Sequence, residues 1–566
     1  MSNENTRLTG TGESLNPVFT EQSRHNHHRD HDHNYDHDHD PRHHNQYISA
    51  HTKRLLNSRH ISMISIGGII GTGLFMGIRQ TLTNGPIISI VSYFYISGLC
   101  YFIITAVGEM SCYMPLNGSL CQFQFRFISN PVGVMNNFVY WMSWSITLGL
   151  ELGLIYELLC QFASPSGEEI FYSSQVMLGH KTLVILSAWT LLTAANLFPV
   201  NYYGEIEFLV TIIKIAFMFA WVGLSMVLVT TRLGFANWTN LDLIWGVNAI
   251  EVVDNRVMNK VVNSLSSSIV SSCFTFQSIE SVGICSGEIE DIGRNLPKAI
   301  RYIVVRICVF YIGSLTLLTL MIPSNDPSII NNNGSSSSDG NENSVMSSPF
   351  VIALVNCGIG NNSILIHVVN FVILTSMISA ANSNIYFGSR CLLSMVEEGY
   401  FWRTFARTTS RGGVPVYAIL LTSSLGLVVS LLSNLKNMGT FLTLLINLSA
   451  TSGLLMWLFV SISYLRFRQA LEYNNIAYHD LAYTSRFILP MEKSAWVSIM
   501  SIIFIILSNG VTNIWQFSWD SFASCYLTSI VVIVGVLYCS YKWQESVLMP
   551  VEKIDIFTSQ SATALK

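Results

Sequence analysis

The sequence predicts an all-α polytopic membrane protein with twelve membrane-spanning helices. Half of its 566 residues are hydrophobic and only 11% are charged, whereas charged residues make up about 25% of a soluble domain. Twelve apolar runs are long enough to cross a hydrocarbon core of about 30 Å. They lie roughly at 61–82, 88–113, 134–162, 181–200, 206–231, 263–285, 301–323, 362–388, 414–433, 438–465, 494–513 and 519–542.

The chain before the first run is polar and rich in histidine. Residues 1–55 include Asp30-His-Asp-His-Asn-Tyr-Asp-His-Asp-His-Asp40, which is typical of a disordered cytoplasmic tail. A weak metal site is the less favoured interpretation of its histidines, which are His31, His33, His37 and His39. We expect residues 56–545 to form the transmembrane domain and 546–566 a second short tail.

The charges of the loops predict how the chain is oriented. An even number of spans places both termini on one side. The loops assigned to that side carry most of the Lys and Arg, for example at 294–301 and 403–411, so the positive-inside rule places both termini in the cytoplasm. Two sequons then fall outside, at Asn237 and Asn333, and are candidate glycosylation sites.

The first apolar run is unusually rich in glycine, at Gly67, Gly68, Gly71, Gly73 and Gly77. Each glycine weakens a helix by about 1 kcal/mol relative to Ala, so the run predicts a helix that breaks within the membrane. Such a break exposes N–H groups at one helix end and carbonyls at the other, which suit the carboxylate and the ammonium of an amino acid. A close-packing face between helices explains the glycines equally well.

The sixth run has a weaker interruption at the matching position, five spans later. Thr275, Gln277 and Ser278 are polar, and Gly283 and Gly287 follow. A pair of interrupted segments at corresponding positions indicates an inverted repeat. We therefore expect the two runs to lie at matching positions in two five-helix halves.

Three charged residues lie well inside the predicted spans: Glu151, Lys214 and Glu280. A buried charge in a membrane is costly and is a functional candidate by default. The alternative is mutual pairing, such as Lys214 with a carboxylate, that only makes burial tolerable. Three further carboxylates lie nearer the span ends, where water solvates a charge at low cost: Glu109, Glu157 and Glu205.

Several motifs resemble those of the fungal amino-acid permeases of the amino acid–polyamine–organocation superfamily, most closely the basic amino-acid permeases. They are Arg59-His-Ile-Ser-Met-Ile64, Gly71-Thr-Gly-Leu-Phe75, Leu82-Thr-Asn-Gly-Pro86, Gly108-Glu-Met110, Asn196-Leu-Phe-Pro-Val200, Tyr202-Tyr-Gly-Glu205, Phe274-Thr-Phe-Gln277, Phe310-Tyr-Ile-Gly-Ser314, Ile378-Ser-Ala-Ala-Asn-Ser-Asn-Ile-Tyr386 and Gly412-Gly-Val-Pro415. The resemblance covers nearly the whole membrane region. It implies a fold of two inverted five-helix repeats, with two broken helices, plus two further helices. It also implies import of an amino acid driven by protons and working by alternating access.

The resemblance also implies where the substrate backbone binds. Its carboxylate would meet the N–H groups of Gly71, Thr72 and Gly73. Its ammonium would meet carbonyls near Ile69 and near Phe274 and Thr275, with Phe274 as an aromatic gate. Further polar residues of the sixth and tenth spans are assigned to the substrate site: Gln277, Ser278, Ser449, Thr451 and Ser452.

The three intramembrane charges match functional positions of the same family. Glu151 matches the acid expected to face the cationic side chain of the substrate. Glu280 matches the coupling carboxylate. Lys214 matches the lysine that replaces sodium in proton-driven relatives.

Two departures from the family pattern keep other functions open. The sixth span reads Ser278-Ile279-Glu280 where the family has Gly-Thr-Glu, and the loop after it reads Asp291-Ile-Gly-Arg294 where Asn-Pro-Arg-Lys is usual. Loss of the glycine is expected to stiffen the hinge. An amino-acid sensor with little transport, or a permease of broader specificity, is therefore an alternative.

We expect a proton-coupled plasma-membrane importer of lysine and arginine. Its expected partners are an amino-acid substrate, the lipid bilayer, and ubiquitin and trafficking machinery at the tails, where Lys53 is a generic acceptor. No cofactor beyond the proton gradient, no resident metal and no nucleic acid are expected. An enzyme is disfavoured because the loops contain no nucleophile–base pair, phosphate loop or metal-ligand constellation.

Overall fold

The structure is a computed structural model, and the described residues belong to one compact unit, Tyr47–Lys566. They are residues 56, 58–68, 70–163, 174–233, 238, 257–330, 348–360, 363–409, 412–433, 438–485, 490–509, 519–558, 560, 561 and 564. A parallel bridge joins the extended backbone of Leu56 to that of Ile289. The predicted tail at 1–55 and the sequons at Asn237 and Asn333 lie outside the described residues.

The prediction of an all-α polytopic membrane protein is confirmed. Eight helices in the described part are long and apolar enough to cross a membrane: Pro86–Tyr113, Asn130–Cys160, Val200–Arg232, Ile364–Glu397, Val416–Ser433, Leu444–Tyr473, Met491–Ser508 and Phe522–Trp543. Helices also occupy the other four predicted ranges, and the count of twelve stays a prediction.

The first span is broken where its glycines lie. Helix α1 (Ser58–Gly67) ends at the first glycine, and the chain resumes at Gly73 in a π-helical turn, η1 (Gly73–Gly77), followed by α2 (Ile78–Leu82). The packing explanation of the glycines also holds, because a Cβ added to Gly73 would lie 2.8 Å from the Cα of Thr275. The glycines therefore both interrupt the helix and let a neighbouring backbone approach.

The sixth span is broken as well. Helix α10 (Val257–Phe276) stops four residues before α11 (Ser281–Ile284), and a short 3-10 turn, η3 (Ser286–Glu288), follows. Between them Ser278 has φ of +82°, in the left-handed region that L-residues other than glycine rarely adopt. The predicted interruption is confirmed, and the residue with the left-handed backbone conformation in it is a serine.

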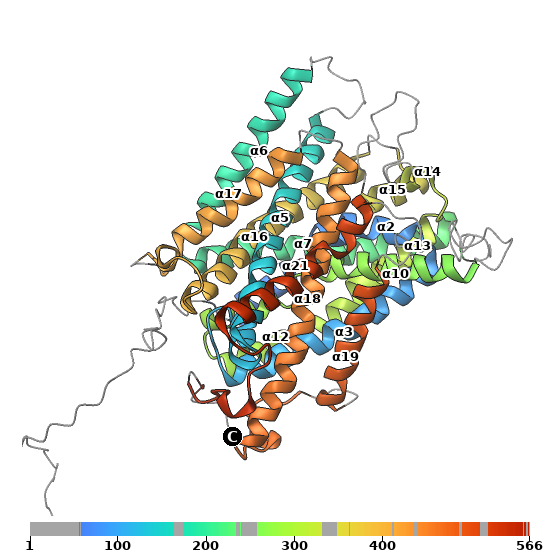
Figure 1. The fold of residues 1–566 in the computed structure, drawn as a ribbon. Helices are drawn as coiled ribbons and strands as arrows, with labels where there is room; N and C mark the ends of the chain where they lie inside the picture. The colour runs from blue at the N-terminus through green and yellow to red at the C-terminus, as the bar shows by residue number, and fades with distance from the viewer. Residues whose placement is uncertain are drawn as a thin grey trace, which may run out of the picture. The chain divides into compact units, whose positions relative to one another are not determined.

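Long helices surround the two breaks (Figure 1). They are α3 (Pro86–Tyr113), α5 (Asn130–Ala163), α7 (Val200–Leu228), α16 (Ile364–Glu397) and α18 (Met438–Tyr473). Helix α5 packs against α16 and α18, α1 packs against α7, and α10 packs against α3. Large apolar side chains remain exposed on these helices, among them Phe94, Leu209 and Phe371, as expected for a surface that faces lipid.

The remaining elements complete the bundle and its connections. They are α4 (Ser119–Phe127), α6 (Ser174–Asn196), η2 (Val229–Leu233), α12 (Ile292–Arg306), η4 (Ile307–Gly313), α13 (Ser314–Met321), α14 (Pro327–Ile330), α15 (Pro349–Asn356), η5 (Arg403–Ala406), α17 (Val416–Ser433), η6 (Tyr478–Asp480), α19 (Met491–Ser508), α21 (Trp519–Trp543) and η7 (Val551–Lys553). The seventh predicted span is thus one helical path with a π-helical stretch, η4, in its middle.

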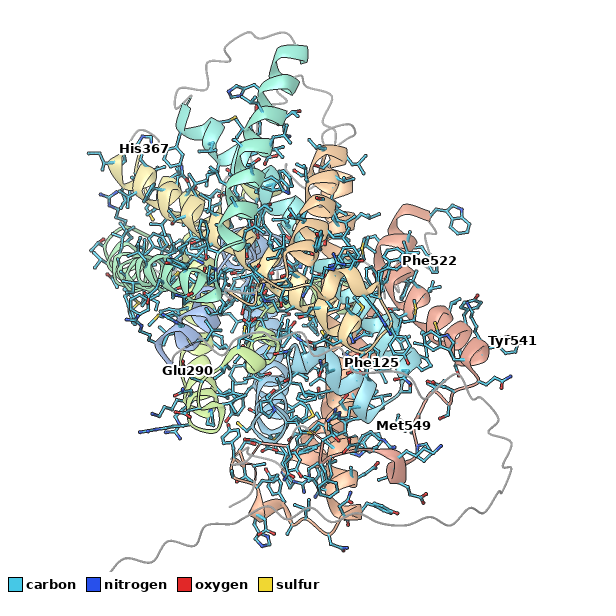
Figure 2. All side chains as sticks on the ribbon, turned by 90° about the vertical axis from the view of Figure 1, so that its left-hand side faces the viewer. Phe125, Glu290, His367, Phe522, Tyr541 and Met549 are labelled. Atoms are coloured by element: carbon cyan, nitrogen blue, oxygen red, sulfur yellow. The ribbon has the colours of Figure 1, made fainter. Side chains whose placement is uncertain are left out.

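The segment after α21 lies against one end of the bundle. The N–H of Met549 donates to the carbonyl of Ile128 at 2.8 Å, and the N–H of Ser561 donates to that of Tyr113 at 2.9 Å. Figure 2 shows Met549 and Glu290 toward the end opposite His367, which lies in the first turn of α16. The C-terminal segment therefore covers the end of the bundle where α3 finishes.

Candidate functional site

The two broken helices touch each other at their breaks. The Thr275 hydroxyl lies 3.2 Å from the carbonyl oxygen of Gly73 and also accepts a hydrogen bond from the Tyr93 hydroxyl at 3.1 Å. A Cβ added to Gly77 would lie 3.4 Å from the Phe274 ring. The structure thus brings the predicted residues Gly73, Phe274 and Thr275 together, whereas Ile69 lies outside the described residues.

Gly71 and Thr72 stand at the start of the second half of the first span. The first N–H groups of a helix have no partner within it, and they favour an anion because of the helix dipole. A Cβ on Gly71 would lie 3.1 Å from the Cβ of Ala380 on α16. The start of η1 therefore lies against α16, and N–H groups at such a helix start favour an anion.

Glu151 is brought to this same point from α5. Its side chain accepts a hydrogen bond from the Thr72 hydroxyl, and the residue is only 3% exposed. Thr72 is the residue that precedes η1. A buried carboxylate thus lies beside the helix start, where it can meet the cationic end of a ligand whose own carboxylate is bound there.

Lys214 of α7 hydrogen-bonds to α1 and to α16 beside the first break. Its ammonium donates to the carbonyl of Gly67, the last residue of α1, at 2.8 Å and to the Ser379 hydroxyl of α16 at 2.9 Å. Its Nζ lies 3.8 Å from Oε1 of Glu207, and both side chains are completely buried. The ammonium thus occupies the carbonyl end of a half-helix, which favours a cation.

Glu207 was not selected from the sequence, although Lys214 was expected to pair with some carboxylate. The two residues are seven positions apart, about two helical turns, and so share one face of α7. That spacing is the one sequence feature that predicts the pair. Glu205, only two positions away, is 48% exposed and binds Arg59 and His60, as expected for a carboxylate near a span end.

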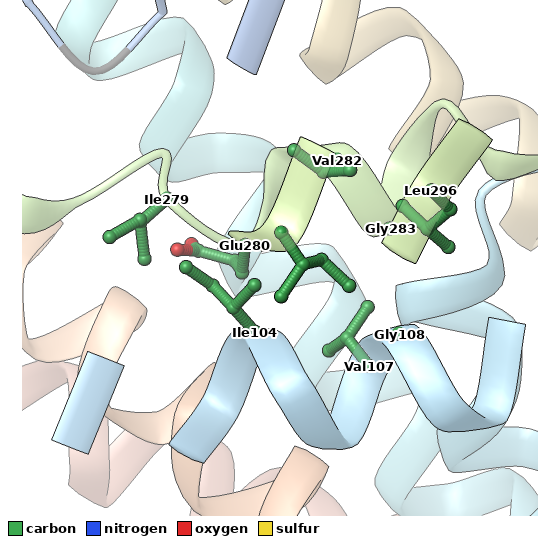
Figure 3. Close-up of a pocket in the computed structure, with 9 residues that line it drawn as sticks. Ile104, Val107, Gly108, Ile279, Glu280, Val282, Gly283 and Leu296 are labelled. Carbon is green, nitrogen blue, oxygen red and sulfur yellow. The ribbon is translucent and has the colours of Figure 1, made fainter. Parts of the chain in front are cut away.

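Glu280 occupies a separate apolar hollow between α3, α11 and α12 (Figure 3). The Tyr140 hydroxyl donates to its Oε1 at 2.7 Å. All the other residues that line the hollow are aliphatic or glycine: Ile104, Val107, Gly108, Ile279, Val282, Gly283, Leu296 and Ile300. Among the described residues, no hydrogen bond or ion pair joins Glu280 to Lys214, so the two predicted coupling groups occupy different places.

Gln277 and Ser449 belong to a polar cluster between α5, the α10–α11 turn and α18. Ser449 donates to Oε1 of Gln277 at 3.0 Å, and Nε2 of Gln277 donates to Ser143 at 3.1 Å. Ser143 and Thr147 also lie 2.9 and 3.0 Å from the Ser449 hydroxyl. These two residues were missed, although they precede Glu151 by eight and four positions and therefore share its helix face.

The other predicted substrate residues are not linked by hydrogen bonds to these clusters in the described part of the chain. Thr451 and Ser452 are buried on α18, and within the described part of the chain their hydroxyls have no hydrogen-bond partner. Ser278 lies in the turn between α10 and α11. The structure joins Thr72 to Glu151 and Gln277 to Ser449. Among the described residues, no side-chain hydrogen bond joins Thr451 or Ser452 to either pair.

The expectation that Glu109 is a solvated carboxylate is wrong. The residue is 1% exposed and is satisfied by protein donors instead of water. Tyr464 and Tyr478 donate from their hydroxyls at 2.7 and 2.8 Å, and Ser485 donates from both its N–H at 2.7 Å and its hydroxyl at 2.6 Å. The donors come from far along the chain, so Glu109 holds α3 against α18 and the loop that follows it.

Two helices broken inside an apolar bundle, with buried charges near the breaks, are typical of membrane transport proteins. The chain belongs to the amino acid permease family, whose model matches residues 60–553.

Curated relatives match over most of the chain. A lysine/arginine permease of Candida albicans is 34% identical over 524 residues, covering 89% of this chain and 84% of the relative. A lysine-specific permease of Saccharomyces cerevisiae is 33% identical over 518 residues, covering 90% and 79%. A basic amino-acid permease of the same yeast is 35% identical over 469 residues, covering 81% and 76%.

Solved structures also match, among them that of a transporter. It is the nucleobase-cation-symport-1 family transporter Mhp1 in a closed conformation with bromovinylhydantoin bound. The TM-score is 0.48 at 11% identity, over 89% of this chain and 97% of the transporter.

Proposed function

We propose that this protein imports cationic amino acids, lysine or arginine, across the plasma membrane together with protons and by alternating access. The observation that carries the proposal is the contact between Thr72 and Glu151. It puts a buried negative charge within reach of the helix start where a substrate carboxylate would bind. The three relatives are permeases of lysine, arginine or basic amino acids by name, and they support the same substrate class.

The proposed pose follows from the half-helix ends. The substrate carboxylate accepts from the N–H groups of Gly71, Thr72 and Gly73, and its ammonium faces the carbonyls of the α10 break near Phe274 and Thr275. The cationic side chain displaces the Thr72 hydroxyl from Glu151 and takes its place. Polar groups tune the choice among basic side chains, and they are Gln277, Ser278, Ser449, Thr451 and Ser452.

Replacement of Glu151 tests the substrate class. Glu151→Gln removes the charge and keeps the shape, so the substrate cation loses a charge-assisted contact of about 1.5–3 kcal/mol. We expect lysine and arginine uptake to fall at least about tenfold at normal abundance in the plasma membrane. Glu157→Gln, on the same helix near the span end, is the matched control and should keep uptake. Unchanged uptake in Glu151→Gln would favour a permease of broader specificity.

Proton coupling is assigned to Glu280 and Lys214. Both are buried side chains that can exist charged or neutral, and both belong to elements adjoining a break. Lys214 holds the end of α1 through the hydrogen bond from its ammonium to Gly67, and a neutral amine would donate a weaker hydrogen bond there. A change in its protonation would therefore change how firmly the first half-helix is held, which links proton movement to the opening of one side of the site.

The sensor is the second candidate, and Ser278 favours it. A serine held at φ of +82° costs more there than glycine does, so the hinge between α10 and α11 is stiffer than one with glycine. A sensor would bind lysine or arginine without accumulating it. Equilibrium binding to the purified protein, measured beside uptake into vesicles that contain it, separates the two functions.

A further inference from the structure

Three buried side chains on α7 and α16 form a continuous hydrogen-bonded path. The Lys214 ammonium donates to the Ser379 hydroxyl at 2.9 Å, and that hydroxyl donates to Oε1 of Glu207 at 2.6 Å. The direct separation of Nζ from Oε1 is 3.8 Å, and both charged side chains have no exposed surface. One hydroxyl therefore stands between a buried proton donor and a buried proton acceptor.

From Lys214 the path leads toward the N-terminal end of α7 (Val200–Leu228). Glu207 precedes Lys214 by seven residues, and Glu205, two positions earlier still, is 48% exposed. Residue 67 is a glycine, which leaves space for the Glu207 carboxylate. A Cβ at that position would clash with Oε1 of Glu207 and with the Thr211 hydroxyl. Glu207 thus lies beside Gly67 at the end of α1, and along α7 it stands between Lys214 and the exposed residue Glu205.

Other titratable groups around the pair are few. On α7 itself, Tyr203 lies one turn before Glu207; on α1, His60 packs against Gly204 and lies 3.0 Å from Glu205. On the other side of Lys214, the nearest acid is Glu151 of α5. The α16 face offers hydroxyls, Ser379 and Ser383, and α13 contains no titratable residue.

A single proton transfer converts this charged pair into a neutral one. Lys214 gives a proton to the Ser379 oxygen while the Ser379 hydroxyl proton passes to Glu207. The products are an amine, an unchanged hydroxyl and a carboxylic acid, so the step needs no other reactant. It removes two buried charges, each of which is expensive to desolvate, and it frees the Gly67 carbonyl from its ammonium.

We propose that Glu207 is a proton-carrying residue of the transport cycle, which takes the proton of Lys214 through Ser379 and releases it at the exposed end of α7. This inference rests on the proposed proton-coupled transport. It adds a buried acceptor for the proton of Lys214, and it makes Ser379 a positioning residue whose hydroxyl is required.

The test uses the full-length protein in proteoliposomes, with two readouts for labelled lysine. One is exchange between equal lysine concentrations without a pH gradient, and the other is accumulation driven by an imposed gradient. For one proton per substrate, one pH unit drives an accumulation ratio of about tenfold. We expect Glu207→Gln to keep exchange and to lose gradient-driven accumulation, whereas the matched control Glu205→Gln keeps both.

The hydroxyl is tested separately, in case Glu207→Gln does not fold. Ser379→Ala should lose gradient-driven accumulation while it keeps exchange, and Ser379→Thr, which retains a hydroxyl, should keep both. Accumulation by Glu207→Gln equal to that of the parent protein would overturn the proposal. Equal loss of exchange and accumulation in folded Glu207→Gln and in Ser379→Ala would also overturn it, because a purely structural pair gives that result.

Failure of the proposed function looks different from failure of this inference. If the parent protein exchanges lysine but does not respond to the pH gradient, proton coupling itself is wrong and Glu207 has no proton to carry. If the parent responds and Glu207→Gln responds equally, coupling stands and only the role of Glu207 falls.

Discussion

Arg390 Nε lies 3.3 Å from Oε1 of Glu288 in a buried ion pair that ties the second broken helix to α16. Tyr386 donates to the other carboxylate oxygen, and the Arg390 guanidinium lies 3.9 Å from the centre of the Tyr386 ring. The backbone carbonyl of Glu288 also accepts from the N–H of Leu56 at 3.1 Å, just before α1. Glu288, which follows the second broken helix, thus binds both the segment before α1 and the long helix α16.

Removal of one partner of this pair should be strongly destabilising. Glu288→Ala leaves the Arg390 charge buried and unpaired, which costs about 3–5 kcal/mol of unfolding free energy. The control is the pair Arg468–Glu492, in which Glu492 is 56% and Arg468 18% exposed, and Glu492→Ala should cost less than about 1 kcal/mol. Denaturant unfolding of the purified protein measures both, and equal losses would contradict the structural role of the pair.

Ser278→Gly should relieve backbone strain. A left-handed conformation costs an L-residue about 1–2 kcal/mol, and glycine avoids that cost. We expect a more stable protein and, because the hinge between α10 and α11 becomes easier to move, a higher initial rate of uptake. Asn475, exposed at φ of +58°, is the control, since asparagine tolerates this conformation and Asn475→Gly should change little. A slower Ser278→Gly protein would refute the interpretation of the hinge.

Gly73→Ala should block transport by separating the two broken helices. The new Cβ would lie 2.8 Å from the Cα and 3.1 Å from the carbonyl oxygen of Thr275, which are backbone atoms that cannot rotate away. Gly98→Ala on α3 is the control, because nothing lies within 4 Å of its added Cβ and Ala favours a helix by up to about 1 kcal/mol. Lysine uptake normalised to surface abundance is the measurement. Equal uptake by the two variants would show that the close approach is not needed.

Glu280→Gln should separate substrate movement from the proton gradient. The glutamine keeps the acceptor for the Tyr140 hydroxyl but carries no titratable proton in its apolar hollow. We expect exchange of labelled lysine to continue while accumulation stops responding to external pH. Normal pH-driven accumulation in this variant would assign coupling to the Lys214 and Glu207 pair alone.

Features that depend on local composition could be predicted from the sequence. The glycines of 67–77 and the polar stretch around Ser278 indicated the two breaks, and the apolar runs indicated the helices. The cost of burying charge singled out Glu151, Lys214 and Glu280, all of which are buried in the structure.

Contacts between distant segments could not be predicted in the same way. The donors to Glu109 lie more than 350 positions later in the chain, so nothing near residue 109 shows that water is replaced by protein. Glu207 was not selected from the sequence, and Glu205, two positions away, has similar local surroundings but is 48% exposed, whereas Glu207 is completely buried. Only the packing of α7 against α1 and α16 distinguishes the two.

The most direct test of proton-coupled import is uptake of radiolabelled lysine and arginine into cells that lack their own basic amino-acid permeases, with and without a protonophore. We expect both substrates to accumulate and the protonophore to abolish that accumulation. Absence of accumulation, with the protein shown to be at the cell surface, would contradict import and favour the sensor.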